Sequence, residues 1–153
     1  MSLPATLRFG NSLVKLAIGA AILGVAAGGC NKQITDRDIE PISLTEVRAL
    51  VERPGSALLI DPRPPSAFAA GHLPGARNMQ LADVRPERGV DPALDRYGQL
   101  VVYGDDPGTG SAVAMTKRLM MTGYKKVRMF MGGMSEWKRA GLPVEGESGA
   151  GGG

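Results

Sequence analysis

The sequence predicts one α/β domain in which a mostly parallel sheet is covered by helices on both faces. Continuous apolar runs of strand length occur at residues 57–60 and 100–103, a third predicted strand lies at residues 127–131, and segments with a helical pattern lie between them. Strands that are buried on both faces have such unbroken apolar runs, and their alternation with helices is typical of parallel sheets. A length of 153 residues and an apolar fraction of 43% are sufficient for one domain of this kind.

The first 29 residues are expected to be a signal peptide. They carry two basic residues and no acid, and the apolar run at residues 16–29 is short for a membrane span of about 20 residues. Small residues precede Cys30, which resembles the lipobox of bacterial lipoproteins. We therefore expect a lipid on Cys30, a short spacer over residues 30–38, and a body on the periplasmic or extracellular side of a bacterial cell envelope. An ordinary secretory signal and an uncleaved anchor are the alternatives.

Composition excludes several classes of site. After the first 29 residues, the chain has 16 basic and 15 acidic residues, so it is nearly neutral. It has no basic stripe with interleaved aromatics. A nucleic-acid partner is therefore not expected. One cysteine and one histidine exclude an intrachain disulfide, a dithiol pair and a metal cluster built on Cys or His. We expect no metal and no cofactor.

The first helix of the domain is predicted to follow Ser43, which forms a capping box with Glu46. Pro54 and Gly55 are expected to end this helix. The apolar positions of the helix share one face; they are Leu44, Val47, Leu50 and Val51. The buried strand at 57–60 comes next.

Shorter elements are predicted between the first two buried strands. Three prolines at residues 62–65 interrupt regular structure before a helical turn at residues 66–71. Residues 72–79 are expected to turn and then extend. A short helix is predicted over 81–88, followed by a loop or helical turn over 89–98.

The strand at 100–103 leads into a glycine-rich loop and a longer helix. Ser111 is expected to cap that helix, which extends to Met121, with Gly123 just beyond its end. After the third strand, a last helix is predicted over residues 134–140 and ends at Gly141. Residues 146–153 are expected to form a flexible glycine-rich tail.

Three motifs, in this order along the chain, resemble those of a single rhodanese-like domain, and the resemblance covers residues 39–145. The first is a D-x-R motif after the first strand, the second is the stretch GHLPGA, and the third is a pair of glycines followed by a tryptophan and AGLPV. The residues that match are Asp61, Arg63, His72, Pro74, Gly75, Gly132, Gly133 and Trp137. The resemblance implies a five-stranded, mostly parallel sheet with helices on both faces, and a structural role for these residues. Asp61 and Arg63 are expected to fix the loop that follows their strand.

The loop after residues 100–103 departs from the family pattern. In active members a cysteine opens this loop and carries a persulfide, and an arginine closes it. Here the cysteine position falls at Gly104, or at Asp105 when counted back from Ser111, and the arginine position falls at Gly110. Because the only cysteine is Cys30, the resemblance implies a member without persulfide sulfurtransferase activity.

The sequence leaves open what this loop does instead. Its candidate ligand-binding residues are Gly104, Asp105, Asp106, Gly108, Thr109, Gly110 and Ser111. The glycines favour a backbone cradle for an anion at a helix N-terminus, whereas two aspartates repel an anion or attract a weakly bound cation.

Three functional hypotheses remain. The leading one is an envelope-anchored binding or scaffold module with an unidentified protein partner. The alternative is a hydrolase or other enzyme that uses Asp105, Asp106 or Ser111 on small anionic or ester substrates. Such chemistry needs a base for a hydroxyl, or Mg²⁺ and a cationic clamp for a carboxylate. The third is a domain kept for stability or assembly, with a silent loop.

Overall fold

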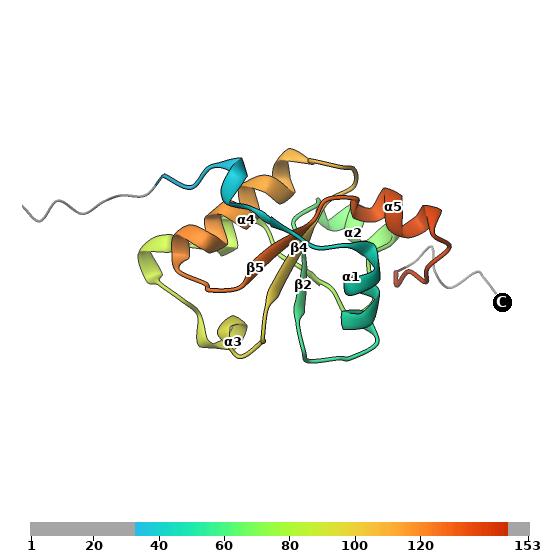
Figure 1. The fold of residues 1–153 in the computed structure, drawn as a ribbon, viewed down its shortest axis with the longest axis horizontal. Helices are drawn as coiled ribbons and strands as arrows, with labels where there is room; N and C mark the ends of the chain where they lie inside the picture. The colour runs from blue at the N-terminus through green and yellow to red at the C-terminus, as the bar shows by residue number, and fades with distance from the viewer. Residues whose placement is uncertain (1–32, 147–153) are drawn as a thin grey trace, which may run out of the picture. The chain divides into compact units, whose positions relative to one another are not determined.

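The computed structural model describes residues 33–146 (Figure 1). The signal peptide, the lipid on Cys30 and most of the glycine-rich tail lie outside these residues and stay predictions. Within residues 33–146, no helix is long and apolar enough to cross a membrane.

The centre of the domain is a five-stranded sheet in the order β1-β5-β4-β2-β3. Every neighbouring pair of strands is parallel, so the prediction of a mostly parallel sheet is confirmed. The strands are β1 (Glu40–Pro41), β2 (Leu58–Asp61), β3 (Arg77–Asn78), β4 (Leu100–Tyr103) and β5 (Val127–Phe130). The three predicted strands, at residues 57–60, 100–103 and 127–131, are β2, β4 and β5. Each predicted end lies within one residue of the observed end. The two edge strands have only two residues each, and neither has an apolar run.

Helices cover both faces of the sheet (Figure 1). One face packs against α4 (Gly110–Thr122), α3 (Pro92–Asp95) and the 3₁₀ turns η2 (Leu81–Asp83) and η3 (Pro86–Arg88). The other face packs against α1 (Leu44–Val51) and α5 (Gly133–Arg139), and α2 (Pro65–Ala70) lies at the same side. A further 3₁₀ turn, η1 (Asp36–Asp38), precedes β1. All residues of β2 and β4 are buried, because alternate side chains enter the two cores.

Helix α1 confirms the capping-box prediction. The Ser43 hydroxyl accepts from the Glu46 N–H at 3.3 Å, and the Glu46 carboxylate accepts from the Ser43 N–H at 3.0 Å. The helix ends at Val51, three residues before Pro54, because a proline disfavours helical geometry in the residue before it.

Two details of the predicted helices are wrong. Ser111 does not cap α4: the helix begins at Gly110, its N-cap is Thr109, and Ser111 is an exposed residue of the first turn. The predicted helix over residues 81–88 is two 3₁₀ turns, since Pro86 at the start of η3 disfavours helical geometry in Arg85, which is extended. The end of α4 is as expected, with Gly123 in the left-handed region at φ 107°.

Candidate functional site

The glycine-rich loop lies at the carboxyl edge of the sheet, between β4 and α4. In parallel α/β sheets, ligands usually bind outside the carboxyl ends of the strands. The segment after β2 and the N-terminus of α5 flank the loop at this edge. We therefore take residues 104–111 and their contacts as the candidate site.

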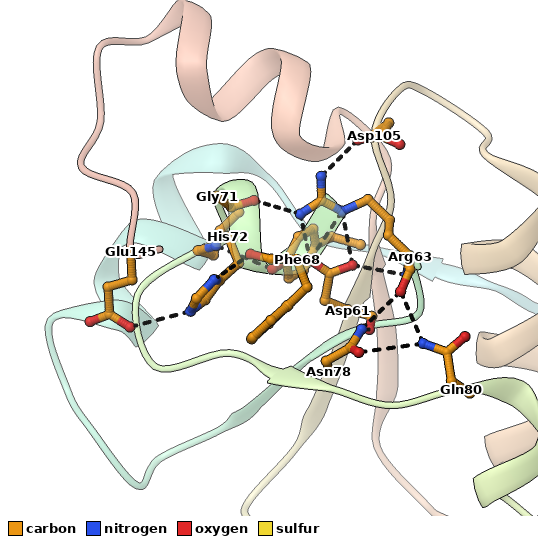
Figure 2. Close-up of polar contacts among 11 residues, drawn as sticks. Asp61, Arg63, Phe68, Gly71, His72, Asn78, Gln80, Asp105 and Glu145 are labelled. Carbon is orange, nitrogen blue, oxygen red and sulfur yellow. Dashed lines mark hydrogen bonds and ion pairs between the residues drawn. The ribbon is translucent and has the colours of Figure 1, made fainter. Parts of the chain in front are cut away.

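A buried ion pair anchors the segment after β2 (Figure 2). Asp61 is fully buried and Arg63 is 4% exposed. The Arg63 guanidinium donates from Nε to Asp61 Oδ1 at 2.9 Å and from one terminal nitrogen to Asp61 Oδ2 at 2.7 Å. The same terminal nitrogen donates to the Gly71 carbonyl at 2.7 Å. Burial of two charges carries a large desolvation cost, which these bonds offset only while all of them are present.

The remaining nitrogen of Arg63 reaches the loop. It donates to Asp105 Oδ1 at 2.8 Å, and the Asp105 side chain is 55% exposed. Burial alone lowers the pKa of Arg63, but its hydrogen bonds and charge interactions with Asp61 and Asp105 outweigh burial and raise the pKa above its usual value. The guanidinium therefore stays charged. One cation faces two carboxylates, so this cluster carries a net negative charge.

The loop is also bonded to the start of α5. The Gly104 carbonyl accepts from the Met134 N–H at 2.9 Å, and the Asp105 carbonyl accepts from the Ser135 N–H at 2.8 Å. The Asp106 carboxylate accepts from the Ser135 hydroxyl. Both aspartates of the loop thus have a partner within the domain.

Gly133 allows this close approach between the loop and α5. A Cβ at this position would lie 2.5 Å from the Gly104 carbonyl oxygen, and Gly133 has φ +56°, which other residues rarely adopt. This explains one glycine of the motif that precedes Trp137. Trp137 itself is buried and donates from Nε1 to the Pro143 carbonyl at 2.8 Å.

Gly104 has no room for a side chain. A Cβ at this position would lie 2.6 Å from the Cβ of Thr109. Thr109 is held in place because its hydroxyl accepts from the Asp106 N–H at 3.0 Å and donates to the Asp106 carbonyl at 2.7 Å. Gly108, at φ +73°, lets the chain turn back toward α4, whereas open space surrounds the Cβ position of Gly110. Gly104 is the first of the two positions that match the family's cysteine. The space that a side chain would need there is therefore occupied by Thr109.

His72 belongs to a different part of the edge. Its Nδ1 bonds to the Phe68 carbonyl at 2.8 Å, its ring stacks on Phe68 at 3.7 Å, and its Nε2 lies 3.7 Å from Glu145 Oε2. Glu145 also accepts from the Gly75 N–H at 2.9 Å, in the turn that includes Pro74. The GHLPGA stretch thus binds the C-terminal segment of the domain. In the part of the chain that the structure describes, no hydrogen bond joins His72 to Ser111.

The sequence left a weakly bound cation open as another ligand of the loop. Among residues 33–146, no group of three or more His, Cys, Asp or Glu side chains is placed to hold a metal ion. The two loop carboxylates bind Arg63 and Ser135 instead of converging on a common point.

Sequence reasoning missed the partners of the loop and of Arg63. Ser135 was not a candidate, nor were Asn78 and Gln80, whose side-chain amides donate to the Arg63 carbonyl at 2.8 and 3.0 Å. A signal was present for the bond between Arg63 and Asp105, because both follow strands that end at the same edge. No pattern in the sequence singles out Ser135.

The domain is thus a parallel α/β fold with a closed glycine-rich loop at its carboxyl edge. The family model of the rhodanese-like domain matches residues 43–140, and the chain belongs to this family. It is 32% identical over 92 residues to an HTH-type transcriptional regulator of Mycobacterium tuberculosis, a match that covers 60% of this chain and 38% of the regulator. It is 22% identical to rhodanese-like domain-containing protein 14, chloroplastic, of Arabidopsis thaliana, with 73% of this chain and 67% of that protein covered.

A solved structure supports the fold. The crystal structure of a Bacillus halodurans protein superimposes with a TM-score of 0.63 at 16% identity and covers 74% of this chain and 82% of its own. Together with the family model, this likeness confirms the rhodanese-like fold expected from the three motifs.

Proposed function

We propose that this protein is an envelope-anchored rhodanese-like domain that does not transfer sulfur through a persulfide and acts as a binding or scaffold module. The observation that carries the proposal is Gly104. The position that opens the loop has no thiol, and Thr109 fills the space that a side chain would need.

The electrostatics of the loop support the same proposal. A persulfide cycle needs a thiolate nucleophile, and positive charge or converging amides stabilise thiolates. Here the nearest guanidinium is already bonded to Asp61 and Asp105, and Asp106 adds a further negative charge. A dianion such as thiosulfate is repelled by this arrangement.

The structure gives the hydrolase hypothesis no comparable support. Asp105 and Asp106 are bonded to Arg63 and Ser135, and the single histidine is bonded to Phe68. A hydroxyl nucleophile needs an adjacent base, and Ser111 has no hydrogen bond to one within residues 33–146.

The sulfurtransferase reaction provides the test. The full chain in detergent and its Cys30→Ser variant are incubated with thiosulfate and cyanide, and thiocyanate is measured. We expect no rate above that of the uncatalysed reaction for either protein. Turnover by the Cys30→Ser variant would refute the role as a binding module, because a chain without a thiol would then catalyse sulfur transfer by a route other than a persulfide. Turnover that is lost in the variant would assign the reaction to Cys30 and would contradict both its lipidation and the inactivity.

The binding role is tested by comparing two baits. The full chain and an Asp105→Asn, Asp106→Asn double variant are used to capture proteins from an envelope extract of the source cell. A scaffold that acts through the loop predicts a partner that the double variant loses. Capture of the same proteins by both baits would exclude the loop as the binding surface.

A further inference from the structure

A separate cavity of about 340 Å³ lies on the face of the sheet that α4 covers, away from the loop. It is enclosed by the end of β3, the connection over residues 83–94 and the C-terminal end of α4. Small-molecule sites usually have volumes of about 300–1,000 Å³, so this cavity suits a small ligand.

The floor of the cavity is apolar and its walls are held in place. Its buried lining residues include Met79, Val84, Leu94 and Tyr124. The Tyr124 hydroxyl accepts from the Asp91 N–H at 2.9 Å, which fixes the connection against the segment after α4. Arg118 of α4 donates to the carbonyl of Val84 at 3.4 Å and to that of Leu81 at 3.1 Å, which ties the same connection to the helix.

The charged residues at the cavity are unequally engaged. The carboxylates of Asp83 and Asp91 accept from the N–H groups of Gln80 at 2.7 Å and Ala93 at 2.8 Å. The guanidinium groups of Arg85 and Arg88 are exposed, and within residues 33–146 neither has an ion pair or a side-chain hydrogen bond. Among the charged side chains of the cavity, the two arginines therefore have free donors, whereas Asp83 and Asp91 each hold a backbone N–H.

We propose that this cavity binds a small amphiphilic carboxylate, with its apolar body on the buried floor and its head on Arg85 and Arg88. The planar fork of a guanidinium matches the two oxygens of a carboxylate, and such charge-assisted bonds are about twice as strong as neutral ones. This inference does not depend on the loop, because no lining residue belongs to residues 104–111.

Three matched probes separate the contributions of charge and apolar surface. Hexanoate has both features, hexanamide has the same chain without the charge, and acetate has the charge without the chain. The ¹⁵N-labelled full chain in nanodiscs is titrated with each probe, and the amide signals of Val84, Val90 and Leu94 are followed by NMR. A site-resolved signal is needed because the sequence contains a second apolar stretch, at residues 16–29, to which an apolar probe could also bind. We expect saturable shifts with hexanoate, and dissociation constants at least about tenfold larger for hexanamide and acetate.

The variants test the arginines directly. The Arg85→Gln, Arg88→Gln double variant is expected to weaken hexanoate binding by at least about tenfold, since it removes the charge-assisted bonds. Both side chains are exposed, so the fold is expected to persist, and unchanged signals from α1 would confirm this. Arg139→Gln makes the same kind of charge change on α5, which packs on the other face, and is expected to leave binding unchanged. The proposal is overturned if hexanoate shifts none of the cavity signals, if hexanamide binds equally well, or if the double variant binds like the unaltered chain.

Discussion

Replacement of Asp105 by asparagine is expected to lower the free energy of unfolding by about 1 kcal/mol. Asparagine keeps the shape of the side chain but removes the charge that faces Arg63 at 2.8 Å. A hydrogen bond between charged groups contributes about 1.5–3 kcal/mol, and a neutral one about 1 kcal/mol. Because the Asp105 side chain is 55% exposed, water offsets part of the difference.

The matched variant at the other carboxylate sets the scale. Asp61→Asn makes the same chemical change at a fully buried side chain that accepts from Nε and a terminal nitrogen of Arg63. Removal of one partner from a buried ion pair costs about 3–5 kcal/mol. The carboxylate of Asp106 accepts an exposed hydrogen bond from the Ser135 hydroxyl. Asp106→Asn is therefore expected to cost less than about 1 kcal/mol.

Urea unfolding of the full chain in a non-denaturing detergent measures this order. The single tryptophan, Trp137, is buried in the core, so its fluorescence reports the unfolding of the domain. The reasoning requires Asp61→Asn to be the most destabilising of the three variants, with Asp105→Asn next. Two results would contradict this reasoning about Arg63. One is an equal loss in the free energy of unfolding for Asp105→Asn and Asp61→Asn, and the other is no loss for either variant.

Three further outcomes are expected. Gly133→Ala should destabilise the domain by about 2 kcal/mol or more, because the new Cβ would contact the Gly104 carbonyl and because Gly133 has φ +56°. Gly110→Ala is the control, since open space surrounds its Cβ position. Equal urea midpoints for the two variants would contradict the argument. The pKa of Glu46 is lowered from 4.5 to about 2 by its bonds to Ser43 and Arg128, so its stabilising contribution should be complete above pH 4.5 and disappear as the pH falls through 2. Glu46→Gln should therefore reduce the loss of stability over that range, as measured by thermal unfolding at each pH. Mass spectrometry of the native protein should show a chain that begins at Cys30 with lipid attached, and an unmodified, uncleaved N-terminus would disprove the lipoprotein prediction.

The sheet was predictable because its central strands β2, β4 and β5 are mostly apolar. Residues 100–103 are flanked by strands on both sides and by helices on both faces, so every side chain had to be apolar or aromatic. Edge strands have no such requirement. Glu40–Pro41 is exposed, and its sequence gave no sign of a strand. Arg77–Asn78 has no apolar run either, but it lies within residues 72–79, which were expected to turn and then extend.

The site was predictable in its position but not in its contacts. The order of motifs placed residues 104–111 at the carboxyl edge, and the buried pair of Asp61 and Arg63 was expected to fix the segment after β2. The capping role assigned to Ser111 was wrong, because the hydroxyl of Thr109 binds back to Asp106 and the N-cap lies two residues earlier than expected, at Thr109. Local spacing could not show this, since it depends on how the loop folds on itself. The bond from Arg63 to Asp105 joins positions 42 residues apart, and only the packed sheet brings them together.

The contact between Gly104 and Thr109 bears on how such a loop could regain a thiol. A single substitution that introduces cysteine at position 104 would place its Cβ 2.6 Å from that of Thr109, so the new residue would first disrupt the loop. A smaller residue at position 109 would relieve that contact but would leave the carboxylate of Asp105 on Arg63 and that of Asp106 nearby. Position 104 therefore resists a thiol through its packing against Thr109 as well as through the charge of the loop.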